Sequence, residues 1–341
     1  MSGRSRPRVP ERPVLVAPDS FKGTFRATQV AAAIGRGLEA AGLLPPDLCP
    51  VADGGEGTTE VLLTALGGET AGARVHDALG REVDAGIALI DDGAAAVVEM
   101  AAASGLALIA EAERDPWAAS TRGTGELIVA AARAGAAVIL VAVGGSATTD
   151  GGAGAIEAIE AAGGLGGARL VVLCDVRVPW ERCASLFGPQ KGADPGMVSR
   201  LERRLDELAA RLPKDPRGVP MTGAAGGLAG GLWAAFGAVL EPGAPWVLDA
   251  LGFDARMRAA RCVIAGEGRL DGQSLLGKVV GEIGTRTRQA GVPLHAVVGQ
   301  DAMDAFAKRM IDLQAVEEAT TLEEIAAAGA RLGAALRALA I

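Results

Sequence analysis

The 341-residue chain has few aromatic side chains: they make up 3% of its residues, and tyrosine is absent. Hydrophobic residues nevertheless account for 50% of the sequence. A core built from them must therefore consist mainly of Ala, Val, Leu and Ile. A chain of this length has enough residues for two domains with sizeable cores.

Histidine and cysteine are also scarce, with two His and four Cys. His76 and His295 leave little room for a Ser-His-Asp hydrolase or a dehydrogenase that relies on His, and His295 lies in an apolar run typical of a core strand. No two cysteines form a C-x-x-C pair, which argues against a zinc site. Buried free thiols in a reducing cytoplasm are the interpretation that this favours.

Long apolar runs and a basic surface are missing as well. No run reaches the length of a membrane span, and residues 1–13 carry four arginines but no apolar core of a signal peptide. The net charge is −8, and the basic residues are scattered along the chain, which argues against a nucleic-acid partner. We therefore expect a cytoplasmic protein without a membrane partner that binds small molecules, as a monomer or a homodimer.

Glycine, in contrast, is abundant: 49 residues, about twice the usual share, with no collagen period. The central example is 136–157, where the apolar run 138–143 predicts a buried strand, 144–152 is a loop rich in Gly, Ser and Asp, and a helix follows. Glycine lets backbone N–H groups turn toward a ligand, and a helix N-terminus adds positive charge. Such a loop is typical of an anion or phosphate site, and a tight turn without a ligand explains a single loop equally well.

The same arrangement recurs in three other segments, 14–23, 50–59 and 261–278. In an open α/β sheet, ligands bind at the carboxyl ends of the strands, where all four loops would lie. Turn chemistry alone explains four converging loops poorly. The sequence therefore predicts one site built from several loops.

Lysine is rare, and its positions favour a phosphate ligand. Of five lysines against 28 arginines, Lys22, Lys191 and Lys278 lie in or beside the glycine-rich loops. A compact point charge suits phosphate, while chance placement at turns is the alternative. The segment 272–278 matches part of a P-loop, but Val279 stands where Ser or Thr would bind Mg²⁺, and we expect no strand to lead directly into it. No G-x-G-x-x-G follows the first strand, which weakens a nicotinamide interpretation.

Four carboxylates in these loops are candidates for a metal ligand or a general base: Asp53, Asp150, Asp175 and Asp271. Phosphoryl transfer needs cations and backbone donors for the phosphate charge, acids for Mg²⁺, and a carboxylate to accept the proton of the acceptor hydroxyl. For any single one of them, a helix cap is an equally good explanation.

The order of elements predicts an α/β fold. The apolar strand 14–17 is followed by a helix in which Val30, Ile34 and Leu38 recur every fourth residue, and this β–loop–α beginning is typical of a doubly wound sheet. From residue 72 on, short strands linked by turns predict an antiparallel or mixed sheet. Asp194 with Pro195 predicts a helix start, Thr321 with Glu324 a capping box, and 223–231 a hinge or a helix start.

Eight segments resemble, in order, the signature segments of the type 1 glycerate kinases: PDSFKGT, PVADGGEGT, STRGTGELI, GGSATTDGG, LCDV, FGPQKGA, GAAGGL and GEGRLDGQSLLGK. The resemblance implies ATP-dependent phosphorylation of D-glycerate to 2-phosphoglycerate or 3-phosphoglycerate by direct phosphoryl transfer with Mg²⁺. It also implies two α/β domains, one Rossmann-like with a parallel sheet and discontinuous in sequence, with the active site in the cleft between them. We expect a disordered tail at 1–12, the Rossmann-like domain at 13–70 and 225–341, and an inserted mixed-sheet α/β domain at 71–224.

The resemblance, together with the loop chemistry, predicts a role for each site residue. The catalytic residues are Lys22, Asp53 and Asp175; those that bind the substrate are Asp19, Ser20, Glu56, Arg269 and Asp271; those that bind the nucleotide are Gly144, Gly145, Ser146, Lys191, Glu267 and Lys278; and Asp150 is the metal ligand.

The chain departs from the family pattern in three places. Thr149 stands where the family usually has Asn, the segment 175–187 is short and lacks the usual Asn-Pro-Leu, and 191–223 is shorter than usual. Two alternatives therefore remain open: a catalytically silent sensor of small acids with the same fold, and a kinase of another small hydroxy acid.

Overall fold

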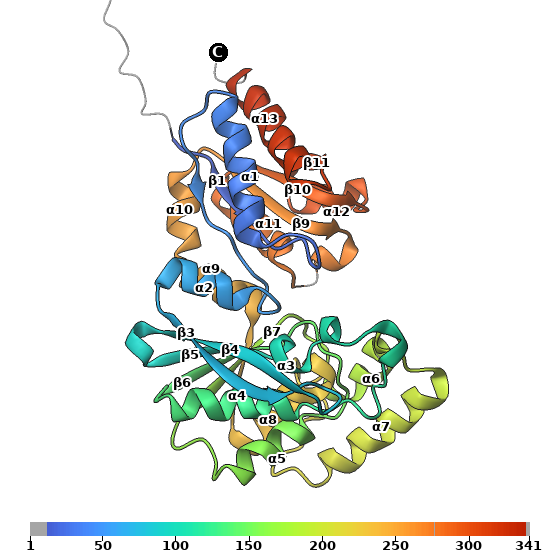
Figure 1. Cartoon of the computed structure of the whole chain (residues 1–341). Coiled ribbons are helices and arrows are strands. Elements are labelled where there is room, and N and C mark those ends of the chain that lie inside the picture. Colours follow the sequence, from blue (N-terminus) through green and yellow to red (C-terminus); the bar gives the residue numbers. More distant parts are fainter. Residues whose placement is uncertain (1–11, 276, 339–341) are drawn as a thin grey trace, which may run out of the picture. The chain divides into compact units, whose positions relative to one another are not determined.

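The structure, a computed structural model, describes residues 12–275 and 277–338 (Figure 1). Apart from Arg12, the tail expected at 1–12 lies outside these residues. The described chain forms two compact units. The parallel-sheet unit contains residues 12–50, 252–275 and 280–338, and the mixed-sheet unit contains 51–251 and 277–279.

These bounds differ from the expected domain limits at 70/71 and 224/225. The helix α2 (Thr58–Leu66) packs on β4 (Glu82–Ile90) and β5 (Ala95–Glu99), and α9 (Gly243–Ala250) packs on β7 (Arg169–Cys174). Both helices therefore cover the mixed sheet, although their sequence continues the βα alternation of the parallel one.

The parallel-sheet unit contains a five-stranded sheet in the order β11-β10-β9-β1-β2. Every neighbouring pair is parallel. The strands are β1 (Leu15–Pro18), β2 (Asp47–Leu48), β9 (Val263–Leu270), β10 (Leu294–Asp301) and β11 (Leu313–Glu318). Because β1 pairs with β9, two distant stretches of the chain form one sheet, which confirms the Rossmann-like, discontinuous fold.

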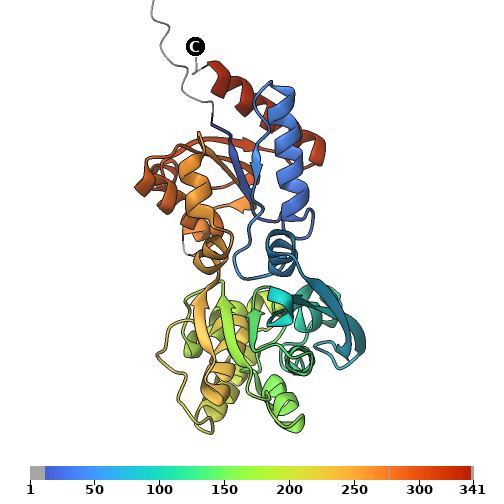
Figure 2. The same ribbon diagram turned by 90° about the vertical axis from the view of Figure 1, so that its left-hand side faces the viewer.

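Helices cover both faces of this sheet (Figure 2). On one face, α1 (Ala27–Ala40) and α13 (Leu322–Ala338) share a core with side chains of β1, β9 and β10. The two helices pack closely because Gly37 has no side chain: a Cβ there would lie 2.0 Å from the Ala326 carbonyl oxygen.

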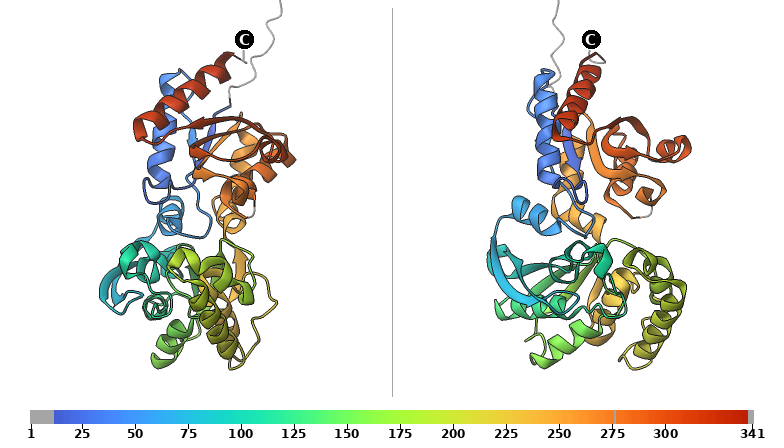
Figure 3. Two further views of the ribbon diagram at one scale, coloured as in Figure 1. Left: turned by 90° about the vertical axis from the view of Figure 1, so that its right-hand side faces the viewer. Right: turned by 45° about the vertical axis from the view of Figure 1, so that its right-hand side comes forward.

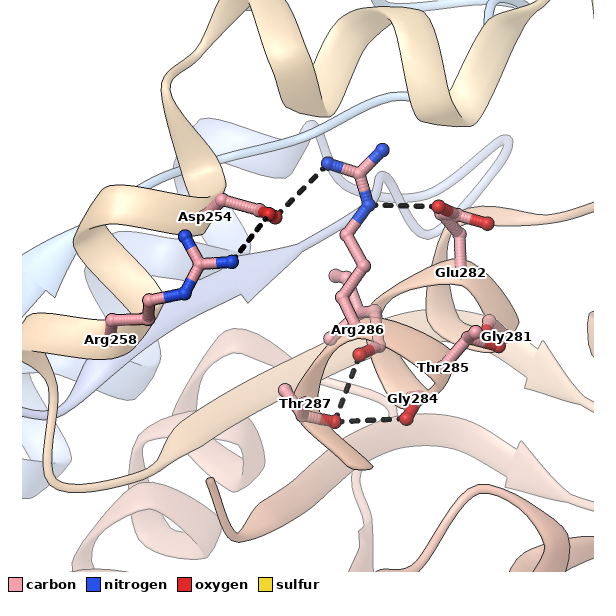
Figure 4. Close-up of polar contacts among 9 residues, drawn as sticks. Asp254, Arg258, Gly281, Glu282, Gly284, Thr285, Arg286 and Thr287 are labelled. Atoms are coloured by element: carbon pink, nitrogen blue, oxygen red, sulfur yellow. Dashed lines mark hydrogen bonds and ion pairs between the residues drawn. The ribbon is translucent and has the colours of Figure 1, made fainter. Parts of the chain in front are cut away.

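On the other face lie α10 (Phe253–Ala259) and α11 (Val279–Ala290), and α12 (Ala305–Met310) connects β10 to β11. An ion-pair chain joins α10 to α11 (Figure 4). Arg286 of α11 bonds to Asp254 of α10 at 3.2 Å and to Glu282, one turn earlier, at 2.8 Å. The Arg286 side chain is 14% exposed, but Asp254 is 43% exposed, so water screens the bond between the two helices in part.

The mixed-sheet unit contains a six-stranded sheet in the order β3-β4-β5-β6-β7-β8, which confirms the mixed sheet. The strands not yet given are β3 (Glu69–His76), β6 (Val138–Ala142) and β8 (Val239–Pro242). The pairs β3–β4 and β4–β5 are antiparallel, while β5, β6, β7 and β8 run parallel. The parallel strands place the ends of β5, β6 and β7 at one edge.

Three helices pack on one face of the mixed sheet: α4 (Arg122–Arg133), α5 (Ala153–Ala161) and α8 (Leu228–Phe236). On the other face lie α2 and α9 (Figures 1 and 3). Short α3 (Ala101–Ser104) follows β5. A separate small core surrounds buried Trp180 and joins α6 (Cys183–Phe187) to α7 (Pro195–Ala209).

The predicted helix signals are confirmed. Asp194 accepts a 2.7 Å bond from the Met197 amide at the start of α7. Thr321 and Glu324 form the reciprocal bonds of a capping box before α13. The glycine-rich segment 223–231 forms a 3₁₀ turn (Ala224–Gly227) that runs directly into α8, so of the two alternatives it is a helix start. In the part of the chain that the structure describes, no helix combines the length and the apolar character needed to span a membrane.

Candidate functional site

The first cluster of predicted site residues lies in the mixed-sheet unit, beyond the carboxyl ends of its parallel strands. The loop 53–57 reaches this edge, where the Val143 amide donates to the Gly54 carbonyl at 3.0 Å. A Cβ on Gly144 would lie 2.6 Å from the Gly55 Cα and 3.5 Å from Asp175 Oδ2. A glycine is therefore required at 144, and three predicted segments meet around it.

Within this cluster, the acidic side chains differ in exposure. Asp53 is 2% exposed, and its Oδ1 accepts from the Gly55 amide at 3.0 Å, which holds the loop in its turn. Glu56 is exposed, and Asp175 is partly exposed just after β7. Of these three, Glu56 and Asp175 are the carboxylates that a ligand can reach.

Glu99, the last residue of β5, belongs to the same cluster and was not anticipated. Its Oε1 accepts from the Thr59 amide at 2.6 Å, at the N-terminus of α2. Burial raises the pKa of the Glu99 carboxyl, and the Thr59 and Gly57 amides oppose that rise. An acid directly after the apolar run 94–98 is the sequence signal that could have revealed it.

The loop after β6 carries Ser146, 9% exposed, and is held from several sides. The buried Lys191 ammonium donates to Ser146 Oγ at 2.8 Å and to the Thr148 carbonyl at 2.5 Å. Arg204 of α7 donates to the Thr149 carbonyl at 2.6 Å. Lys191 is 2% exposed, so its bonds hold the loop on the side that faces the protein interior.

Asp150, predicted as a metal ligand, has both carboxylate oxygens engaged by the protein. They accept from the Thr121 amide and hydroxyl, each at 2.8 Å, and from the amides of Gly152 at 3.1 Å and Gly154 at 3.2 Å. These bonds tie the start of α4 to the start of α5. Among the described residues, no group of three or more His, Cys, Asp or Glu side chains is arranged to hold a metal. The metal role of Asp150 stays a prediction beside this structural one.

The second cluster lies in the parallel-sheet unit, where β1, β9 and β10 end. The Asp19 amide donates to the Gly266 carbonyl at 2.8 Å, and a Cβ on Gly268 would lie 3.4 Å from the Phe21 Cα. Asp19 is 5% exposed, and its Oδ1 accepts from the Ser20 amide at 2.6 Å. Lys22 is exposed in the tight turn 21–25.

Polar side chains of β9 and the turn after it complete this second cluster. Glu267, 6% exposed, accepts from the Ser274 hydroxyl at 2.5 Å. Exposed Arg269 donates to Asp271 at 3.1 Å and to Gln300, near the end of β10, at 3.0 Å. Gln300 was not anticipated from the sequence.

One hydroxyl in this cluster stands out. Ser20 Oγ is buried, and none of the described residues hydrogen-bonds to it. A buried hydroxyl without a partner costs free energy, so it marks a position where a ligand group could be bound.

The expectation that no strand leads directly into the segment 272–278 was wrong. Strand β9 runs to Leu270, and a single residue separates it from the 3₁₀ turn Gly272–Leu275. Helix α11 begins at Val279, so Lys278 precedes it and no Ser or Thr follows. Lys278 is partly exposed and groups with the mixed-sheet unit, as does Gly277, whose Cβ would lie 3.6 Å from the Asp175 carbonyl.

The structure therefore groups the predicted residues into two sets, one per unit. Those in the mixed-sheet unit are Asp53, Glu56, Gly144, Gly145, Ser146, Asp150, Asp175, Lys191 and Lys278; those in the parallel-sheet unit are Asp19, Ser20, Lys22, Glu267, Arg269 and Asp271. Each set combines carboxylates, a cation and backbone amides at the carboxyl ends of parallel strands, which is the composition that phosphoryl transfer requires.

The comparisons with known proteins agree with this composition. The model of the glycerate kinase family matches residues 14–163 and 160–339. The chain belongs to the glycerate kinase family. It is accordingly an enzyme, a kinase.

Similar proteins include the Glycerate 2-kinase of Escherichia coli K12, 38% identical over 84% of each chain, and the Glycerate kinase of Halalkalibacterium halodurans, 38% identical over 84% of this chain and 85% of the relative. A crystal structure from Salmonella typhimurium LT2 described as a glycerate kinase 2 matches with a TM-score of 0.80 at 33% identity, covering 97% of this chain and 99% of that one. The glycerate kinase family thus extends over both units.

Proposed function

We propose that the protein phosphorylates D-glycerate by direct transfer of the γ-phosphoryl group of ATP, giving 2-phosphoglycerate or 3-phosphoglycerate. The observation that carries the proposal is the pair of clusters at the carboxyl ends of the two parallel sheet regions, in a chain of the glycerate kinase family. Relatives named glycerate kinase support the choice of acceptor.

In this proposal the acid is bound by the cluster of the parallel-sheet unit. The unpartnered Ser20 hydroxyl would bond to the acid, and Arg269 would pair with its carboxylate, because a guanidinium fork matches a carboxylate in geometry. Asp19 and Asp271 would orient these two groups through the loops they hold, and Glu56 would contribute to the acceptor pocket. Lys22 would offset the charge that develops during transfer.

The phosphates would be bound by the glycine-rich loop after β6. Gly144, Gly145 and Ser146 present backbone amides and a hydroxyl, Lys278 adds a cation, and Glu267 would contact the nucleotide. Asp175 would accept the proton of the acceptor hydroxyl, because its Oδ2 lies beside Gly144 and it is more accessible than Asp53, which would hold its loop in place.

The cluster also fits a magnesium ion. Mg²⁺ is bound by oxygen ligands and needs only one or two carboxylates when phosphates and water supply the rest. Asp175, partly exposed beside Gly144, has the required donor atoms, and Asp150 would serve only if it gave up hydrogen bonds to the protein. Bound there, Mg²⁺ would neutralise charge on the phosphate oxygens.

An assay of ADP release with D-glycerate, glycerol and hydroxypyruvate tests the proposal. ADP formation with D-glycerate is expected, and phosphorus NMR of the product identifies the hydroxyl that is phosphorylated. Turnover with a different small hydroxy acid but not with D-glycerate would make the protein a kinase of that acid. Binding of a small acid without turnover would favour the catalytically silent sensor.

The two alternatives are included in the test because the segment 175–187 is shorter than in the family. In the structure it is well packed: Trp180 is fully buried, and its indole nitrogen donates to the Leu205 carbonyl at 3.3 Å. The segment therefore keeps Asp175 at the end of β7 although it is short.

A further inference from the structure

Lys191 is a lysine with its ammonium group inside the protein. It ends the 3₁₀ turn Pro189–Lys191, and its side chain is 2% exposed. Burying a charge is costly unless the charge is hydrogen-bonded. Among the described residues, the Lys191 ammonium donates to one segment, the loop after β6, through Ser146 Oγ at 2.8 Å and the Thr148 carbonyl at 2.5 Å.

The loop that Lys191 supports is the one expected to receive phosphates. Gly145 has φ +75°, so part of the loop is in the left-handed region. The Gly145 carbonyl accepts from the Leu106 amide at 2.8 Å. Ser146 is nearly buried, and the only bond recorded for its hydroxyl comes from Lys191 among the described residues. The orientation of that hydroxyl therefore depends on the ammonium.

We propose that Lys191 is a positioning residue, which sets the geometry of the phosphate-binding loop 144–149 through Ser146 Oγ and the Thr148 carbonyl without touching the nucleotide. The proposal rests on the proposed function of that loop. It replaces direct nucleotide binding by Lys191 with an indirect role, because burial keeps the ammonium away from the surface.

The surroundings of Lys191 give the proposal a pH signature. Burial lowers its pKa from 10.5 to about 8, while the Cys183 thiol and the carboxylates of Asp150 and Asp175 act in the opposite direction. Above that pH the amine is neutral, and its bonds to the loop lose the strength that the charge adds. The loop should then hold phosphates less well, so activity should fall as pH rises through about 8.

Stability should change in the opposite direction. The folded protein releases this proton near pH 8, and the unfolded chain releases it near 10.5. Between these values the unfolded state binds more protons, so the contribution of Lys191 to the free energy of unfolding rises with pH. A residue with a purely structural role would not lower activity over the range in which it adds stability.

The test compares the wild type with Lys191→Met and, as a matched control, Lys214→Met. Lys214 is exposed and lies 5.3 Å from the centre of the Trp233 ring. The measurements are kcat and the KM for ATP from pH 6.5 to 9.5, with amide hydrogen exchange over 144–149. Lys191→Met should lower kcat/KM by about tenfold to a hundredfold at pH 7, speed exchange in the loop, and abolish the activity loss near pH 8. Lys214→Met should behave like the wild type.

The proposal is overturned if Lys191→Met keeps the wild-type pH profile and loop exchange. If no variant, wild type included, transfers phosphoryl groups, the proposed function fails while the exchange measurement still decides the role of Lys191. Should Lys191→Met not fold, exchange in the wild type is compared at pH 7 and pH 9.5 after correction for intrinsic rates. Faster exchange at 144–149 relative to β6 supports the proposal, and equal exchange contradicts it.

Discussion

At the scale of single residues, the carboxylates of the site divide by exposure. Asp19, Asp53 and Asp150 are buried and accept hydrogen bonds from backbone amides of their own loops, and Asp150 also accepts one from the Thr121 amide at the start of α4. Asp175 is partly exposed and lies beside Gly144, where a Cβ would come within 3.5 Å of its Oδ2. Exposure and position together make Asp175 the better candidate for proton transfer.

Replacing Asp175 with Asn should therefore lower kcat by about 10²-fold or more, the usual loss for a general base, with little effect on the thermal unfolding midpoint. Steady-state kinetics and differential scanning calorimetry measure the two effects. Glu207→Gln, on the exposed side of α7, is the control. Unchanged kcat in Asp175→Asn would remove it as the base.

Asp150→Asn should primarily destabilise the protein. In this variant an amide NH₂ group, itself a donor, would replace a carboxylate oxygen that now accepts hydrogen bonds from Thr121, Gly152 or Gly154. Loss of buried hydrogen bonds to a charged group should reduce the free energy of unfolding by about 2–3 kcal/mol without Mg²⁺ present. Urea denaturation in EDTA measures it. A variant as stable as the wild type that needs more Mg²⁺ for activity would instead make Asp150 a metal ligand.

At the scale of elements, the contact between α1 and α13 depends on glycine. Gly37→Ala would place a methyl carbon 2.0 Å from the Ala326 carbonyl oxygen, so the helices must separate. We expect a loss of about 1–3 kcal/mol in the free energy of unfolding, measured by urea denaturation. Gly35→Ala in the same helix would meet side-chain atoms alone, the end of Leu48 at 3.2 Å and the Pro46 ring at 3.4 Å, and should cost less. Equal losses would contradict this account of the packing.

Glu99 links β5 to the start of α2, and its effect on stability should depend on pH. Burial raises its pKa above 4.5, so between 4.5 and the folded value the folded state binds more protons than the unfolded chain. The contribution of Glu99 to stability is therefore present at low pH and falls as pH rises through that window. Glu99→Gln cannot ionise at this position. Its free energy of unfolding should therefore rise relative to that of the wild type between pH 4.5 and pH 7, as measured by urea denaturation. A constant difference between the two would refute the assignment.

Much of the fold could be predicted from the sequence because its signals are local. The apolar run at β1, the fourfold spacing of Val30, Ile34 and Leu38, and the cap at Asp194 each act within one element. The unit boundaries could not be predicted in this way. Residues 51–70 continue a βα alternation, and only the non-local packing of α2 on β4 and β5 places them with the mixed sheet.

The candidate site shows the same division. Glycine-rich loops after apolar runs predicted which segments matter, and the structure brings 53–57, Gly144 and Asp175 together. The burial of a loop side chain cannot be predicted from the loop sequence. Lys191 was therefore expected to face a ligand, whereas its ammonium is buried and donates to Ser146 Oγ. Glu99 and Gln300 were missed because their partners come from distant elements.

At the scale of the whole molecule, the chain carries two clusters, one in each unit, and in the proposed function each supplies part of the chemistry of a kinase. The parallel-sheet unit contributes the unpartnered Ser20 hydroxyl and Arg269, and the mixed-sheet unit contributes the loop 144–149 and Asp175. We propose that one catalytic cycle uses groups from both.

Phosphorus NMR of the purified protein, incubated with ATP, Mg²⁺ and D-glycerate, tests whether both clusters serve the same reaction. We expect a phosphomonoester signal of 2-phosphoglycerate or 3-phosphoglycerate that grows in step with ADP, and that is strongly reduced in both Ser20→Ala and Asp175→Asn. No phosphorylated product from D-glycerate in the wild type would contradict this proposal.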